Sequence, residues 1–280
     1  MGFSAVGILY SLTNFVAQFR LHITDTSFIV LKTTKDSILP KWSGQLQITI
    51  YVSTYSMILS ILAIQFFYRF KAVSDPLGLK IFEGAYWILW ISIVIFYGLF
   101  WGLNSWFLAA PSPTVDIELE PEFIKFYCLE FIDYTYMAIQ YFVLDSDQVR
   151  HYRWDSALCI SLLSILMTVT ASGAVYFAYN TYHMLNDVLA HSSSDHSREL
   201  QKQLFRTLIA QTAIPTIFMY IPVSCMFLFP LLGLAIHEWA NLVPVHLAIY
   251  PCLEPIAAMY LIKDFRGKIK GLLIHRFIDS

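Results

Sequence analysis

The sequence is poor in charged side chains, and this scarcity excludes a water-soluble globule. Asp, Glu, Lys and Arg make up 14% of the 280 residues, against roughly 25% in soluble domains. Residues of the AVILMFWYC set make up 57%, aromatic residues alone make up 16%, and the mean hydropathy is +0.58. A chain of this length has too little interior to hide so much apolar surface from water. The sequence therefore predicts a protein of the lipid bilayer.

Cysteines and catalytic motifs are equally scarce. The four cysteines lack CxxC spacing, so no disulfide framework is expected. The motifs GxSxG and HExxH and a glycine-rich phosphate loop are absent. The eight histidines are dispersed, and we interpret the pair His191 and His196 as part of a polar loop. We predict a protein that is not an enzyme, with no catalytic or metal-binding residues and no cofactor. The net charge of −2 gives no reason to expect a nucleic-acid partner.

Long segments without charged residues indicate the fold. Asp, Glu, Lys and Arg are absent from residues 1–19, 42–68, 84–115, 156–186 and 207–237, and a sixth apolar stretch contains only Glu254. A bilayer core of about 30 Å needs about 20 helical residues, and a helix pairs its own backbone groups. We predict an all-α fold, a single polytopic membrane domain over residues 1–280. Its six spanning helices are expected at 1–19, 43–68, 82–104, 157–181, 204–232 and 240–262.

Basic residues near the segment ends predict the orientation. The loops after the second and fourth helices and the C-terminal tail carry eleven Lys and Arg, against seven in the remaining loops, which places the first group in the cytoplasm. Residues 105–156 are then an extracellular loop. Its aromatic stretch 134–144 is too short to span a membrane, and we interpret it as a short helix or lid, or as a solvated loop packed on helix ends. The tail, 264–280, is predicted to form an interfacial amphipathic helix.

Prolines and one acid stand out within the predicted helices. Pro215 and Pro222 lie seven residues apart in the fifth segment, and Pro251 and Pro255 lie four apart in the sixth. Each removes a backbone hydrogen bond and can kink its helix. This suits a bundle that rearranges, although membrane helices also tolerate proline. Glu254 is an intramembrane acid, for which a functional role and a structural hydrogen bond to a neighbouring helix are both reasonable.

Three motifs resemble a known family. They are Gln65-Phe-Phe-Tyr-Arg69-Phe-Lys, the run from Gln203 through Pro215 to Met219-Tyr-Ile-Pro222, and Tyr250-Pro-Cys-Leu-Glu254-Pro255. Together they resemble the nematode serpentine chemoreceptors of the Str class, which are seven-helix G-protein-coupled receptors. The resemblance implies a small-molecule odorant as ligand, a heterotrimeric G protein as partner, and a multi-pass location in the plasma membrane, in a sensory cilium. The stretch Ile8-Leu-Tyr-Ser-Leu-Thr-Asn resembles the second helix of the family, so we expect the first helix to be lacking.

The functional hypothesis that follows is a chemosensory receptor. Aromatic and weakly polar residues of the helices are predicted to bind the ligand, namely Gln47, Thr54, Tyr55, Met219 and His246. The residues predicted to couple to the G protein or to switch are Tyr68, Arg69, Pro215, Pro222, Glu254 and Pro255. The alternatives are a six-helix ion channel or transporter, and a truncated family member that does not signal. Ion flux in proteoliposomes would support the channel, and ligand-dependent nucleotide exchange on a G protein would support the receptor.

Overall fold

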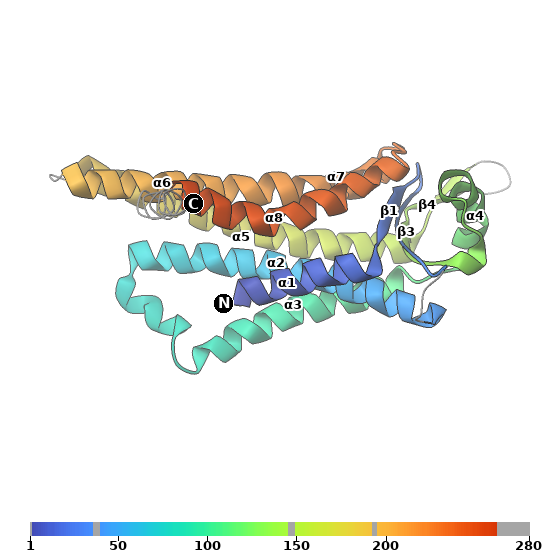
Figure 1. Cartoon of the computed structure of the whole chain (residues 1–280), viewed down its shortest axis with the longest axis horizontal. Helices are drawn as coiled ribbons and strands as arrows, with labels where there is room; N and C mark the ends of the chain where they lie inside the picture. The colour runs from blue at the N-terminus through green and yellow to red at the C-terminus, as the bar shows by residue number, and fades with distance from the viewer. Residues whose placement is uncertain (1, 36–39, 145–148, 192–194, 262–280) are drawn as a thin grey trace, which may run out of the picture.

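A computed structural model describes residues 2–35, 40–144, 149–191 and 195–261, and within these ranges the chain is mostly helical (Figure 1). The elements in chain order are α1 (Gly2–Ala17), β1 (Arg20–Ile23), β2 (Ser27–Thr33), α2 (Lys41–Ser74), η1 (Pro76–Phe82), α3 (Tyr86–Leu108), α4 (Pro113–Tyr127), η2 (Phe131–Asp133), β3 (Tyr134–Gln140), β4 (Phe142–Leu144), β5 (Arg150–Tyr152), α5 (Trp154–His191), α6 (Asp195–Pro215), η3 (Thr216–Tyr220), α7 (Ile221–Leu231), η4 (Glu238–Asn241) and α8 (Leu242–Leu261).

Four helices of the described chain are long and apolar enough to cross a membrane. They are Lys41–Ser74, Tyr86–Leu108, Trp154–Asp187 and Phe205–Leu231, with mean hydropathies of 1.7 to 2.0 in their most apolar windows. The last of these runs through α6, η3 and α7. The remaining two segments of the bundle are α1, which at 16 residues is shorter than the about 20 needed to span, and α8, which has 20 residues.

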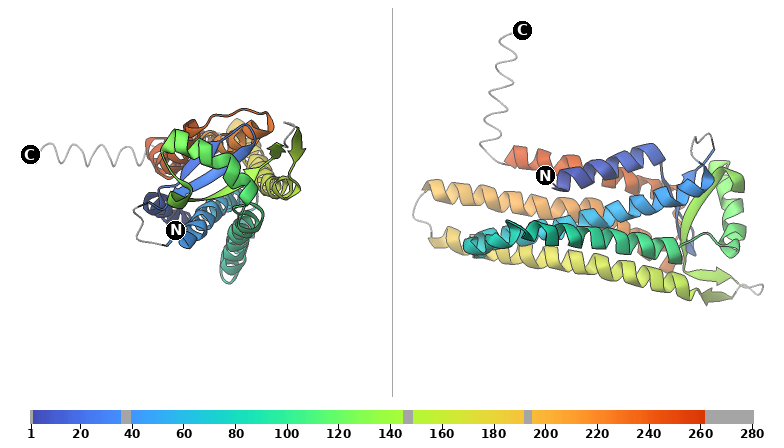
Figure 2. Two further views of the ribbon diagram at one scale, coloured as in Figure 1. Left: turned by 90° about the vertical axis from the view of Figure 1, so that its right-hand side faces the viewer. Right: turned by 90° about the horizontal axis from the view of Figure 1, so that it is seen from below.

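The long helices lie side by side along the length of the molecule (Figures 1 and 2). Helix α2 is central and packs against α1, α3 and α5, while α6 packs against α5 and α8. On α3 the residues facing the bundle include Gly98, Gly102 and Ser105, and a methyl group at Gly102 would meet the Ser53 hydroxyl of α2. Small residues allow this close approach, which is a usual way for membrane helices to associate. The other face of α3 carries exposed apolar side chains such as Phe107.

The prediction of an all-α fold is wrong at one end of the bundle. Residues 20–33 and 134–140 form a three-stranded antiparallel sheet in the order β1-β2-β3, and β4 pairs with β5. The stretch 134–144 is therefore neither a helix nor a solvated loop, because β3 is buried along its whole length. The sheet closes the end of the helix bundle, and α4 covers its outer surface (Figure 2).

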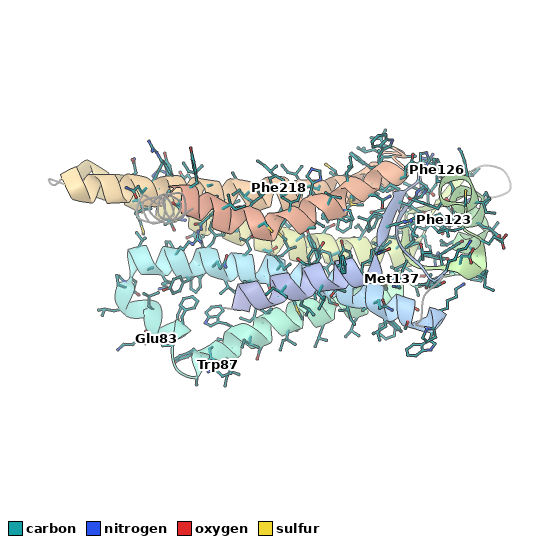
Figure 3. The ribbon with its side chains drawn as sticks, in the orientation of Figure 1. Glu83, Trp87, Phe123, Phe126, Met137 and Phe218 are labelled. Atoms are coloured by element: carbon teal, nitrogen blue, oxygen red, sulfur yellow. The ribbon has the colours of Figure 1, made fainter. Side chains whose placement is uncertain are left out.

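Both faces of this sheet are covered, which is why strands β2 and β3 show no regular alternation of polar and apolar residues. On the outer face Ile29, Leu31, Tyr134, Tyr136 and Ala138 pack with Val115, Leu119 and Phe123 of α4 in one apolar cluster. On the inner face Leu21, Val30, Met137 and Ile139 join the core of the helix bundle. Figure 3 shows Phe123 and Met137 at this end of the molecule and Glu83 and Trp87 at the opposite end. The predicted tail helix, 264–280, lies outside the described residues.

Candidate ligand cavity and switch

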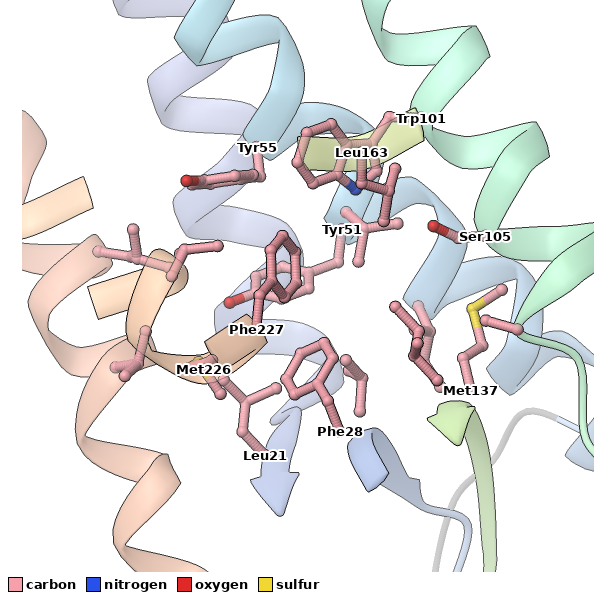
Figure 4. A pocket seen from close by; sticks show the side chains of 18 residues that line it. Leu21, Phe28, Tyr51, Tyr55, Trp101, Ser105, Met137, Leu163, Met226 and Phe227 are labelled. Atoms are coloured by element: carbon pink, nitrogen blue, oxygen red, sulfur yellow. The ribbon is translucent and has the colours of Figure 1, made fainter. Parts of the chain in front are cut away.

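A cavity lies directly beneath the inner face of the sheet (Figure 4). Its volume is about 70 Å³, compared with the roughly 10–15 Å³ that a single water needs, so it has space for a small molecule. The lining comes from β1, β2, β3, α2, α3, α5, α7 and α8 and consists of Leu21, Phe28, Val30, Ile48, Tyr51, Val52, Tyr55, Trp101, Ser105, Ala109, Met137, Ile139, Leu163, Val223, Met226, Phe227, Val243 and Leu247. This enclosure by so many elements makes the cavity sensitive to their relative positions.

The chemistry of the lining is almost entirely apolar. The Tyr51 hydroxyl of α2 accepts a hydrogen bond of 2.9 Å from the Tyr10 hydroxyl of α1. The Tyr55 hydroxyl donates to the Met219 carbonyl at 3.4 Å. The Ser105 hydroxyl points toward the cavity (Figure 4). A pocket of this kind favours a small, uncharged and largely apolar molecule, with Ser105 as the one aliphatic hydroxyl for orientation.

The structure places one of the five predicted ligand residues, Tyr55, in the cavity lining. Met219 is buried next to it and accepts its hydrogen bond. Thr54 is buried but bonds the Tyr51 carbonyl of its own helix. Gln47 donates to the Ser43 hydroxyl, and the His246 ring lies 5.9 Å from Phe218 with its Nδ1 at 2.7 Å from the Leu242 carbonyl oxygen. These last three residues do not line the cavity.

Sequence reasoning missed the residues that the sheet contributes, including Phe28, Val30, Met137 and Ile139. The signal that could have found them is the run Ser27-Phe-Ile-Val-Leu-Lys-Thr33, which is rich in residues that favour strands. Antiparallel pairing then brings Val30 opposite Met137 and Phe28 opposite Ile139, so that both pairs project into the bundle.

A π-helical turn, η3, lies between the two prolines of the fifth apolar segment. Pro215 ends α6, the turn spans Thr216–Tyr220, and Pro222 occupies the first turn of α7. Single π-turns within α-helices occur frequently at functional sites. Met219 and Tyr220 of this turn are buried, and the next turns of the helix contribute Val223, Met226 and Phe227 to the cavity. The irregular turn is thus connected to the cavity through its own helix and through Tyr55.

The opposite end of the bundle holds the predicted coupling residues of α2. The Arg69 guanidinium donates to the Gln211 side-chain oxygen of α6 and lies 5.9 Å from the Phe66 ring. Tyr68 packs edge-on against Phe82, with 5.1 Å between ring centroids. Gln211 lies one turn before Pro215, so the contact between α2 and α6 is adjacent to the π-turn. Glu254 and Pro255 lie in α8, and their side chains are outside the described part of the structure.

Carboxylates of α4 connect this helix to the sheet. Glu118 accepts hydrogen bonds from the Thr26 hydroxyl and from the Gln140 amide, the latter at 2.5 Å, and Asp116 accepts from the Tyr136 hydroxyl at 2.5 Å. Burial raises the pKa of Glu118 above its usual value, against the opposing effect of these hydrogen bonds. Asp116 and Glu118 of this acidic run therefore hold α4 on the outer face of the sheet.

A group of side chains that the sequence scatters meets beside α4. His22 of β1, Glu122 of α4 and His237, which precedes η4, bring their side-chain donor atoms within 4.8 Å of one another. No local spacing in the sequence marks these three residues, because 100 residues separate His22 from Glu122. Burial lowers the pKa of His22, although its hydrogen bond to the Glu122 carboxylate acts in the opposite direction.

The fold and the cavity define a polytopic, mostly helical membrane protein that encloses an apolar space for a small molecule. The sequence model of the Serpentine type 7TM GPCR chemoreceptor Str family matches residues 1–270, so the chain belongs to this family of nematode chemoreceptor G-protein-coupled receptors. The family is not enzymatic, which confirms the prediction of a receptor and not an enzyme.

Curated relatives agree with this assignment. The chain is 28% identical to Serpentine receptor class r-10 of Caenorhabditis elegans over 273 residues, covering 97% of this chain and 79% of the relative. It is 26% identical to Serpentine receptor class r-10 of Caenorhabditis briggsae, covering 95% of this chain and 78% of the relative. It is 24% identical to G-protein coupled receptor str-33 of Caenorhabditis elegans, covering 97% of this chain and 79% of the relative. No solved structure matches the chain.

Proposed function

We propose that this receptor binds a small, uncharged odorant in the cavity beneath the sheet and transmits its binding to a heterotrimeric G protein at the opposite end of the bundle. The observation that carries the proposal is that one helix, running through α6, η3 and α7, contributes to both places. Met226 and Phe227 of α7 line the cavity, and Gln211 of α6 holds Arg69 of α2. We further propose that α1 and α8 also span the bilayer, giving six spans in the plasma membrane of a sensory cilium.

In the proposed mechanism the ligand selects between two arrangements of this helix. A ligand changes a conformational equilibrium only by its difference in affinity for the two states. A hundredfold preference corresponds to about 2.7 kcal/mol, which at about 25 cal/mol per Å² requires the burial of roughly 110 Å² of apolar surface. The nearly apolar lining supports a contribution of this size. Rearrangement at η3 then separates Gln211 from Arg69 and opens the end of the bundle to the G protein.

The test is nucleotide exchange on purified heterotrimeric G protein, with the receptor in nanodiscs and a panel of small uncharged volatile molecules as ligands. Ser105→Leu fills the cavity and removes its hydroxyl, and we expect it to abolish any stimulation that the wild type shows. Ser105→Ala removes the hydroxyl alone and should change the affinity while leaving stimulation possible. The matched control is Ser161→Leu, because Ser161 is exposed on α5 and its hydroxyl bonds only its own helix.

Two results would contradict the proposal. Equal stimulation of Ser105→Leu and the wild type would mean that the ligand binds elsewhere. Ion flux through proteoliposomes without any nucleotide exchange would favour the channel in place of the receptor.

A further inference from the structure

Three polar side chains from distant parts of the sequence converge above the cavity, at the junction of the sheet, α4 and the loop that leads to α8. The His22 Nε2 atom lies 3.2 Å from the Glu122 Oε2 atom, and the His237 Nδ1 atom lies 3.2 Å from the same oxygen. The His22 side chain is fully buried, while 28% of Glu122 and 33% of His237 is exposed. One carboxylate oxygen therefore faces two imidazole nitrogens in a partly enclosed site.

We propose that His22, Glu122 and His237 form a binding site for a divalent transition-metal ion, Zn²⁺ by the nature of its ligands. Two imidazoles and one carboxylate are a common protein ligand set for zinc, and a water completes the tetrahedron. The proposal is independent of the proposed odorant mechanism, since it concerns the outer side of the sheet and is tested by metal binding alone.

Two of the three distances between the donor atoms are close to those of a tetrahedral site. Zinc binds imidazole nitrogen and carboxylate oxygen at about 2.0–2.2 Å, so neighbouring ligand atoms lie roughly 3.3–3.5 Å apart. Both distances to Glu122 Oε2 are 3.2 Å, and all three donor atoms lie within 4.8 Å of one another.

A second layer of contacts orients the ligands as metal sites require. The other ring nitrogen of His22, Nδ1, lies 3.2 Å from the Tyr127 hydroxyl, and Tyr127 in turn lies 3.4 Å from the Asn241 amide nitrogen. The His237 ring stacks on Phe126 with 4.6 Å between centroids. Hydrogen bonding of the non-ligating nitrogen fixes the tautomer that presents the lone pair of Nε2 to the metal.

The arrangement is incompletely satisfied without an ion. The His237 Nδ1 atom is buried and forms no hydrogen bond within the described structure, although it faces Glu122. Buried polar atoms normally have a partner. A divalent cation placed between the carboxylate and the two rings would be a partner for the Nδ1 lone pair and for the other two groups at once.

The backbone around His237 is held in a special conformation that aims its ring at the site. His237 has a φ of +45°, which is uncommon for a residue other than glycine, and its amide donates to the Ile23 carbonyl at 2.9 Å. Leu21, the neighbour of His22, lines the cavity on the inner face of the sheet. A bound metal would therefore fasten the start of α8 to the sheet that roofs the cavity.

The experiment measures metal binding to the full chain, purified in detergent and freed of metal. We expect titration with Co²⁺ to produce the ligand-field absorption of a tetrahedral site and Zn²⁺ to displace it. Glu122→Gln and His237→Ala change partly exposed ligands, so their folding is readily retained, and each should weaken Zn²⁺ binding at least tenfold. Tyr127→Phe removes only the hydroxyl that orients His22 and should weaken binding about tenfold.

The control is His246→Ala, because this histidine of α8 lies outside the group and its Nδ1 is next to the Leu242 carbonyl. It should bind Zn²⁺ with the affinity of the wild type. Melting temperatures recorded without metal verify that each variant is folded. Unchanged affinity in both Glu122→Gln and His237→Ala would overturn the proposal, and so would a folded wild type that binds no Co²⁺ or Zn²⁺.

Discussion

The hydrogen bond between Tyr55 and the π-turn offers the sharpest perturbation of the proposed switch. Tyr55→Phe removes one hydroxyl and leaves the ring in the cavity lining, where it packs edge-on against Trp101 at 5.6 Å between centroids. The lost contacts are the bond of 3.4 Å from the hydroxyl to the Met219 carbonyl and a weaker contact of 3.9 Å with the Met167 sulfur of α5. The apolar volume of the cavity and the helix backbone are otherwise unchanged.

The expected magnitude follows from the bond to the Met219 carbonyl, because the sulfur of Met167 is a weak acceptor. A neutral hydrogen bond contributes about 0.5–1.5 kcal/mol net, and the bond length of 3.4 Å places it at the weaker end of that range. The structure has α2 and α6 joined through Arg69 and Gln211, which we assign to the resting state. Loss of the hydrogen bond between Tyr55 and Met219 should weaken this resting state and raise ligand-independent activity by roughly two- to fivefold. We expect little change in thermal stability.

The assay is the basal rate of nucleotide exchange on the G protein at matched receptor concentration. Tyr51→Phe is the matched control, because it also removes a buried tyrosine hydroxyl of α2, but the lost bond is to Tyr10 of α1. We expect the control to lower the melting temperature without raising basal exchange. A basal rate of Tyr55→Phe equal to that of the wild type, or an equal rise in Tyr51→Phe, would refute the link between Tyr55 and the switch.

Further substitutions test the other parts of the account. Arg69→Ala removes the contact with Gln211 that we assign to the resting state, so basal nucleotide exchange should rise while surface expression persists; a basal rate equal to that of the wild type would remove this contact from the mechanism. Pro222→Ala restores a backbone donor next to η3 and should shift basal activity, whereas a dose–response curve superimposable on the wild type would mean that this proline is only tolerated. Gly102→Ala should lower the free energy of unfolding by about 1–3 kcal/mol, because the added methyl would meet Ser53. Gly173→Ala is the control, since nothing lies within 4 Å of its added methyl, and it should not reduce the melting temperature. Because the pKa of Glu118 is raised in the folded state, stability should fall as pH rises above the usual carboxyl pKa of 4.5, and Glu118→Gln should flatten this dependence.

The helical part of the fold was accessible from the sequence because each long helix leaves an uncharged segment. Helices α2, α3 and α5 all include such segments. The resemblance to the Str chemoreceptor family was carried by the motifs around Arg69, Pro215 and Pro222. The helix ends were less accessible. The α5 helix continues to His191, since polar residues outside the apolar segment still favour a helix.

The sheet could not be predicted from polarity, and this omission also concealed most of the candidate site. A strand with one solvated face alternates in polarity, but β3 is buried at every residue because α4 covers its outer face. Its sequence, Tyr134-Thr-Tyr-Met-Ala-Ile-Gln140, is therefore hard to distinguish from a short apolar helix. Met137 and Ile139 of the cavity were missed for this reason, as was the position of His22 beside Glu122.

The π-turn was only partly foreseen. The pair Pro215 and Pro222 indicated a weakened helix, and η3 lies between them, but a proline pattern does not specify a π-turn in preference to a kink. The location of the predicted ligand residues Gln47 and His246 outside the cavity lining has a similar cause. Polar character within an apolar helix does not show which way a side chain faces.

The most direct test of the central claim measures the distance between α2 and α6 while the cavity is occupied. Val73 of α2 and Arg206 of α6 are both exposed, so spin labels on Val73→Cys and Arg206→Cys report this distance once the exposed Cys128 and Cys252 are replaced by serine. We predict that a volatile ligand that stimulates nucleotide exchange lengthens the distance, and that Ser105→Leu prevents the change. An unaltered distance in the presence of a stimulating ligand would contradict the account.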